Sequence, residues 1–235
     1  MNTLGQFRSA RPLAARPLNV AAGLAAIVLA AANALAAPEG VAAMNRAQPP
    51  SLYAQKLDAA RTAYFQVLTS GSRSADRAAH AALASLESSY PGDPTAEAYH
   101  GSLQLLDAAH DWQVWNLHRN ATEGLERLDQ AVAAAPSNAE VRFLRAATSW
   151  HLPAFYHRRQ QSESDFAWLA SHAISSVHDG NLPPALAAAS LNYWGRILVD
   201  RDDTAAARAA FQQAITLDPA SPGAADAARR LRSLP

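Results

Sequence analysis

Near its C-terminal end the chain carries large and small residues at a fixed spacing that restricts how it can fold. The large residues are Leu191, Trp194 and Phe211, and the small ones are Gly195, Ala207 and Ala214. Pro219 follows them. Two antiparallel helices that pack closely need small residues where their backbones approach and bulky residues beside them. Proline cannot continue a helix, so the second helix should end before Pro219. The spacing therefore predicts a tightly packed helix pair.

This segment resembles the tetratricopeptide repeat (TPR), a helix-turn-helix unit of about 34 residues with large, small and terminating residues at these positions. The match is clearest over residues 188–221, and prolines divide the preceding chain into further units. Together with an N-terminal export pattern and the absence of cysteine, the resemblance suggests a bacterial exported TPR-like protein. Its fold would be an all-α superhelix of about four helix pairs plus a C-terminal capping helix, over residues 52–235. A plain helical bundle is the alternative architecture.

The two earliest units show the pattern in part. In the first, a helix over residues 52–68 precedes the second-helix residues Ala79, Leu83 and Leu86. In the second, Gly101 takes the small-residue position, and the closing prolines Pro91 and Pro136 are 45 residues apart. This unit is about 11 residues longer than the standard repeat. We expect the surplus between its two helices, around residues 107–119.

The third unit also departs from the standard length. Residues 139–150 form a good helical pattern that Pro153 should end. A second helix is expected to begin near Ser162, where Ser162 and Asp165 resemble a helix-starting box, and to close at Asp179 and Gly180. After the fourth unit, residues 224–234 are expected to form the last helix, with its arginines outward.

The N-terminal residues 1–36 resemble a secretory signal peptide. Three arginines precede an apolar stretch, and Ala34-Leu35-Ala36 reads as a cleavage site, which predicts cleavage near Ala36 and Ala37 and a periplasmic or secreted protein. An uncleaved inner-membrane anchor formed by residues 18–37 is the alternative. Residues 37–51 are expected to be a flexible N-terminus of the exported chain.

Composition excludes several classes of function. The chain has no cysteine, which rules out disulfides, thiolate metal sites and cysteine catalysis. Without the three arginines of the signal it holds 17 basic and 20 acidic side chains, and such a balance argues against nucleic-acid binding. No nucleophile elbow or phosphate loop occurs. We therefore expect no enzyme, no cofactor and no stable membrane insertion after signal removal.

The TPR resemblance implies a concave groove lined by the first helices of the repeats, where a protein or peptide partner would dock. The predicted groove residues are Glu140, Phe143, Trp150, Asn192 and Arg196.

Two aromatic segments within the longer units are further candidates. Trp112 and Trp115 lie in one, and Phe155 and Tyr156 lie in the other. They are predicted either to fill space between long units or to present a binding surface. Histidines in these segments, at positions 110, 118, 151 and 157, lack the i, i+4 spacing of a helical metal site, so no metal site is expected there.

The leading hypothesis is an exported TPR-like interaction module, or an assembly or scaffold factor, of the bacterial periplasm or cell envelope. Two alternatives remain from the residues alone. One is a self-assembling structural spacer, and the other is a small-ligand-binding or enzymatic helical protein that uses the aromatic segments.

Overall fold

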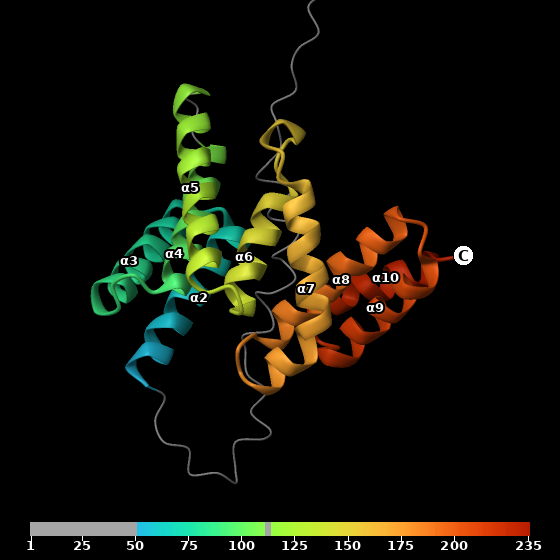
Figure 1. Cartoon of the computed structure of the whole chain (residues 1–235). Helices are drawn as coiled ribbons and strands as arrows, with labels where there is room; N and C mark the ends of the chain where they lie inside the picture. The colour runs from blue at the N-terminus through green and yellow to red at the C-terminus, as the bar shows by residue number, and fades with distance from the viewer. Residues whose placement is uncertain (1–50, 111–113) are drawn as a thin grey trace, which may run out of the picture.

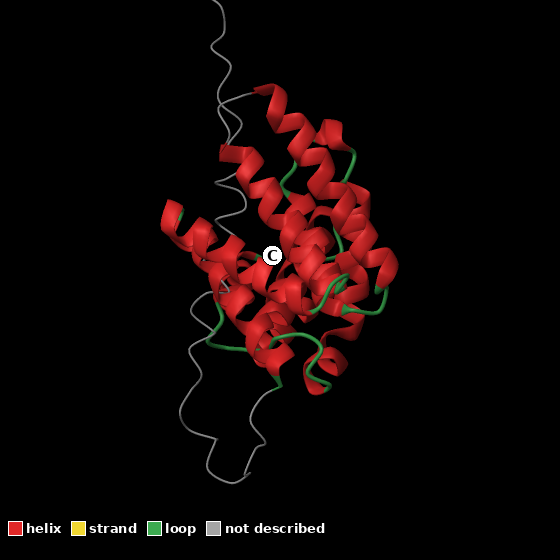
Figure 2. Ribbon diagram, turned by 90° about the vertical axis from the view of Figure 1, so that its left-hand side faces the viewer, coloured by secondary structure: helices red, strands yellow, loops and turns green. Residues whose placement is uncertain are grey.

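The computed structural model describes residues 51–110 and 114–235 (Figure 1). These residues form nine α-helices and one short 3-10 helix, and no strand occurs among them (Figure 2). The all-α prediction is confirmed for this part of the chain. The predicted signal peptide, residues 37–50 and Trp112 lie outside the described residues.

The helices follow one another across the molecule, from α2 and α3 on one side to α9 and α10 on the other (Figure 1). Each packs against the helix before it and the helix after it, and α10 also packs against α8. Their bounds are α2 Leu52–Ser70, α3 Arg73–Ser89, α4 Pro94–His110, α5 Val114–Ala134, α6 Ala139–Trp150, α7 Arg159–His178, α8 Pro184–Asp200, α9 Thr204–Leu217 and α10 Pro222–Ser233. The 3-10 helix η2, Ala154–Tyr156, lies between α6 and α7.

Local capping explains where most of these helices begin. The side chains of Ser51, Ser72, Asn138, Asp203 and Ser221 each accept a hydrogen bond from a backbone N–H in the first turn of the helix that follows. Such caps satisfy donors that a helix start leaves without a partner. The predicted helix over residues 139–150 is confirmed at both ends.

The small residues of the fourth unit lie where the sequence pattern requires close approach. A Cβ added to Gly195 of α8 would come 2.4 Å from Cε1 of Phe211 on α9. Ala207 and Phe211 are fully buried. The helix-pair prediction for α8 and α9 is thus confirmed at the level of individual atoms, and only glycine fits at position 195 without moving the ring.

The second helix pair, α4 and α5, also crosses closely, and here the contact is between the two backbones. A Cβ on Gly101 of α4 would lie 2.7 Å from the carbonyl oxygen of Gly124 on α5, and the reverse distance is the same. Gly101 therefore holds the small-residue position predicted for it.

The expected long connection in the second unit is wrong. The surplus residues lengthen the two helices, because α4 continues to His110 and α5 begins at Val114. The start of α5 projects from one end of the molecule (Figure 1). Trp115 accordingly belongs to the first turn of a helix and not to a loop.

The predicted start of α7 is also wrong, by one turn. The helix begins at Arg159, so Ser162 lies inside it and donates a hydrogen bond from Oγ to the carbonyl oxygen of Arg158. Asp165 is no capping residue, because its carboxylate accepts hydrogen bonds from two arginines of α6. The Ser162 and Asp165 pattern therefore does not mark the start of a helix, and Asp165 instead makes tertiary contacts with α6.

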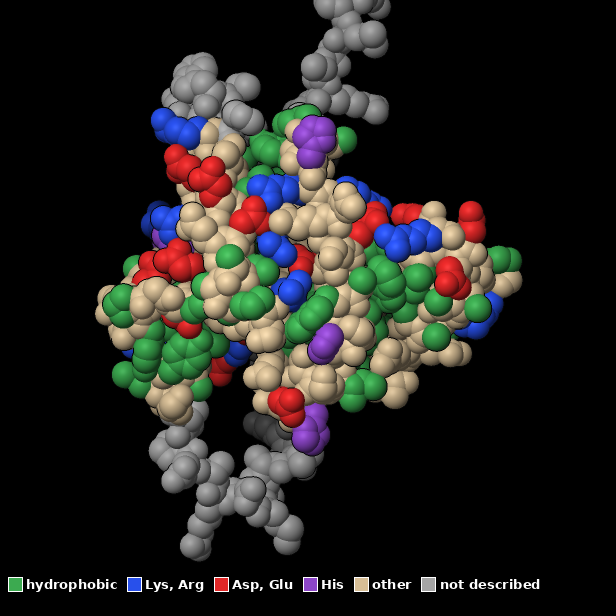
Figure 3. All heavy atoms as spheres, in the orientation of Figure 1, with side chains coloured by type: hydrophobic (Ala, Val, Ile, Leu, Met, Phe, Trp, Pro, Cys, Tyr) green, Lys and Arg blue, Asp and Glu red, His purple; other side chains and the backbone are tan. Residues whose placement is uncertain are grey.

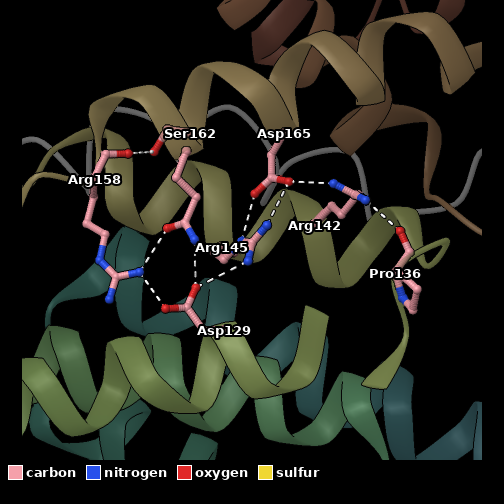
Figure 4. Close-up of polar contacts among 8 residues, drawn as sticks. Asp129, Pro136, Arg142, Arg145, Arg158, Ser162 and Asp165 are labelled. Carbon is pink, nitrogen blue, oxygen red and sulfur yellow. Dashed lines mark hydrogen bonds and ion pairs between the residues drawn. The ribbon is translucent and has the colours of Figure 1, made fainter. Parts of the chain in front are cut away.

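Those arginines form a network that fixes α6 between α5 and α7 (Figure 4). Asp165 accepts from Nη1 of Arg142 at 2.7 Å and from Nε of Arg145 at 2.8 Å. Arg145 and Arg158 both reach Asp129 of α5. Burial alone would lower the pKa of Arg145, but the carboxylates of Asp165 and Asp129 raise it. The network holds the helix that carries Trp150.

None of the helices in the described part is long and apolar enough to cross a membrane. On the face shown in Figure 3, acidic and basic side chains are interspersed.

Candidate functional site

Two of the predicted groove residues, Glu140 and Phe143, are buried in contacts between helices. The Glu140 carboxylate binds the guanidinium of Arg61 on α2 and accepts a 2.6 Å hydrogen bond from the hydroxyl of Tyr99 on α4. Its side chain is 4% exposed, and Phe143 is equally enclosed. These two residues join helices within the chain and offer no surface to a partner.

A chain of hydroxyl groups lies next to that ion pair. The hydroxyls of Tyr64 on α2 and Thr148 on α6 each lie within hydrogen-bond distance of Ser102 Oγ on α4, at 2.5 and 2.7 Å. Burial raises the pKa of Tyr64 to about 12. The first helices of the first three pairs are thus tied together by polar contacts where a binding groove was expected.

Farther along the chain, aromatic rings from α6, α7 and α8 form a compact cluster. Phe166 and Tyr193 stack with their centroids 4.7 Å apart. Trp150 meets both rings edge-on, each at 5.8 Å. Edge-to-face and offset contacts of this kind stabilise beyond the burial of area. The rings fix the geometry of the polar side chains around them.

Three basic side chains surround these rings. The guanidinium of Arg159 lies 3.3 Å from the Trp150 centroid, and that of Arg196 lies 4.9 Å from the Tyr193 centroid. His151 Nε2 is 3.2 Å from the Tyr193 hydroxyl oxygen. We call Trp150, His151, Arg159, Phe166, Tyr193 and Arg196 the aromatic–arginine cluster.

The electrostatics of the cluster keep His151 neutral. Burial, followed by the charges of Arg196 and Arg159, lowers the pKa of His151 from 6.5 to about 4. Burial likewise raises the pKa of the Tyr193 phenol. At neutral pH the positive charge of the cluster therefore resides on the two arginines alone.

The low pKa of His151 predicts a pH-dependent contribution to stability. Between pH 6.5 and about 4 the unfolded chain takes up a proton that the folded chain does not, so stability is lost as the pH falls through this window. Glutamine at position 151 should reduce the loss of unfolding free energy between about pH 7 and about pH 4.5 by roughly 1–3 kcal/mol. Urea unfolding at both pH values measures this difference.

A control for that measurement is His178→Gln, since the side chain of His178 is 86% exposed. It should show the pH dependence of the unsubstituted protein. Equal pH dependence in the His151→Gln variant would contradict a buried, neutral imidazole.

At the edge of the cluster Asn192 contacts the capping helix. Its side-chain amide donates to Oδ2 of Asp226 at 2.9 Å. Asp226 also accepts from Arg229 and Arg230 of α10. Burial would raise the pKa of Asp226, but these donors lower it. Asn192 is therefore part of an internal contact between α8 and α10.

Arg196 differs from the other arginine in the cluster. Arg159 is ion-paired with Glu163 and Asp200. Arg196 is partly exposed and has no carboxylate within ion-pair distance among the described residues. Arg196 also acts as a hydrogen-bond donor toward the Tyr193 hydroxyl, and the remaining N–H groups of its guanidinium are available for a carboxylate. The positive charge at Arg196 would therefore favour an anionic group.

The predicted groove residues therefore separate into two places. Trp150 and Arg196 both contact Tyr193, and Asn192 lies beside it, whereas Glu140 and Phe143 are buried elsewhere. Four of the five are buried, and only Arg196 is partly exposed.

The second aromatic segment provides one ring to the surface and one to the core. Phe155 is 59% exposed, and Tyr156 packs partly buried against the core. In the first segment, Trp115 lies in α5, and Trp112 lies outside the described residues.

Sequence reasoning missed Tyr193, which contacts most of the cluster, and Arg159, which covers Trp150. Tyr193 stands directly before Trp194 of the repeat motif, and the aromatic pair was the available signal.

Comparison with protein-family models, curated proteins and solved structures gives no match for this chain.

Proposed function

We propose that this chain is a TPR-like protein-interaction module of the bacterial periplasm or cell envelope. Two sets of contacts support a repeat architecture: the close helix crossing at Gly101 and Gly124, and the one at Gly195 and Phe211. They occur in the second and fourth helix pairs, α4 with α5 and α8 with α9, at the small-residue position of the motif. Arrays of paired helices usually serve as docking surfaces for other proteins.

The partner we propose carries an acidic side chain. The single observation that favours this choice is Arg196, a partly exposed guanidinium on Tyr193 with no acidic partner among the described residues. A partner carboxylate would form charge-assisted hydrogen bonds with it. The buried Trp150, Asn192, Glu140 and Phe143 would support this surface without contacting the partner.

Binding is tested by reversing charge. Tagged protein, together with the variants Arg196→Glu and Arg77→Glu, would be used to capture partners from envelope extracts, with quantification by mass spectrometry. We expect the same proteins from the unsubstituted chain and from Arg77→Glu, and at least about tenfold less of them from Arg196→Glu, equivalent to about 1.4 kcal/mol.

Arg77 is the matched control because it is an exposed arginine on α3, far along the chain from the cluster. Equal capture by all three proteins would contradict docking at Arg196. Trp150→Ala is unsuitable for this experiment, since loss of the indole would disturb the packing of Phe166 and Tyr193.

The proposed export rests on the N-terminal sequence pattern alone. N-terminal sequencing of the protein from a periplasmic fraction is expected to begin at Ala37. Recovery of the chain with Met1 intact in the cytoplasm would contradict export.

A further inference from the structure

Away from the aromatic–arginine cluster, three side chains with metal-binding atoms converge between α3 and α4. Asp76 and His80 are one turn apart on α3, and Asp107 lies opposite on α4. One ligand atom from each lies within 4.8 Å of the other two. Among residues 51–110 and 114–235, this is the group of three that a metal ion would fit.

The separations of these atoms suit a small divalent cation. His80 Nε2 is 3.0 Å from Oδ2 of Asp107 and 3.8 Å from Oδ1 of Asp76. Ligand atoms about 2.0–2.2 Å from a zinc ion in tetrahedral geometry lie about 3.3–3.5 Å from one another. Shifts of a few tenths of an ångström would bring the two distances from His80 into that range, and the two carboxylates lie within 4.8 Å of each other.

The chemistry of the three ligands indicates which ion would bind. An imidazole nitrogen favours zinc and neighbouring transition metals, whereas magnesium and calcium prefer oxygen ligands alone. The side chains of Asp76, His80 and Asp107 are 38%, 45% and 38% exposed. An ion can therefore reach them from solvent, and water can complete its coordination.

A second contact between α3 and α4 shows that the group is more than a histidine beside an acid. His100 of α4 lies 2.7 Å from Glu87 of α3, but within the described part of the chain no second carboxylate lies within ion-pair distance of His100. At Asp76, His80 and Asp107 two carboxylates face one imidazole, and a cation would relieve the repulsion between them. From Asp76, His80 and Asp107 we infer that the chain binds one Zn²⁺ ion between α3 and α4.

A bound ion would connect the first helix pair to the second, because α3 and α4 belong to different pairs. Zinc should therefore raise the thermal unfolding midpoint of the protein, since a ligand that binds only the folded state stabilises it.

The test is calorimetric titration of untagged full chain with zinc chloride at about pH 7.5. We expect one Zn²⁺ per chain for the unsubstituted protein and for His100→Gln. Binding should be at least about tenfold weaker for His80→Gln and for Asp107→Asn. The zinc-dependent rise in the unfolding midpoint should disappear in the same two variants.

Circular dichroism shows whether each variant is folded, and the two variants change different helices, so either one carries the test. Zinc binding of equal strength in the unsubstituted protein and in both variants would overturn the assignment. An equal loss in His100→Gln would do the same, because it would indicate binding by surface histidines in general.

Discussion

Replacing Asp165 with asparagine is expected to lower the free energy of unfolding by about 3–5 kcal/mol. Asp165 is 1% exposed and neutralises Arg142 and Arg145, whose own side chains are 18% and 13% exposed. Asparagine keeps the shape but removes the charge, which leaves a buried guanidinium without its main partner. Equilibrium unfolding in urea measures the loss.

The control for this substitution is Asp200→Asn. Asp200 also contacts an arginine, Arg159, but its side chain is 65% exposed and the distance is 3.3 Å. Exposed ion pairs contribute about 0–1 kcal/mol, so this variant should unfold almost as the unsubstituted protein does. If both variants lost similarly little unfolding free energy, the charges of the network in Figure 4 would not be shielded from water.

The second large effect is expected at the crossing of α8 and α9. Phe211→Ala should cost about 3–5 kcal/mol, because it removes a fully buried ring and leaves a cavity. Gly195→Ala should cost about 1–3 kcal/mol, since its methyl group would lie 2.4 Å from that ring. Both values come from urea unfolding.

Combining substitutions at the two positions tests the contact itself. In a Phe211→Leu background the smaller side chain makes room, so Gly195→Ala should cost less than it does alone. A coupling of at least about 0.5 kcal/mol is expected. If the changes in unfolding free energy simply add, position 195 does not pack against position 211, and the repeat pattern does not predict this contact.

The burial of the predicted groove residues changes where binding is expected. Glu140 lies where α2, α4 and α6 meet, and its carboxylate binds Arg61 of α2 and Tyr99 of α4. Removing Arg61 would be costly, because the buried Glu140 charge would have no water to solvate it. Arg196 on α8 has no carboxylate partner within the described chain, which is why the proposed contact lies there.

Local signals in the sequence determined the helices and their close crossings. Asn138 and Pro153 are enough to delimit the helix Ala139–Trp150, because capping and the missing proline N–H act within one turn of the backbone. The position of Gly195 relative to Phe211 was likewise readable, since the two helices are adjacent in sequence and joined by a short turn.

Only the tertiary structure decided which polar residues meet. Glu140 binds Arg61 across 79 residues, and His80 meets Asp107 across 27. It also decided that the extra residues of the second unit lengthen α4 and α5. Such pairings depend on how whole helices stack and on the cost of burying charge. No periodicity within a single helix carries that information.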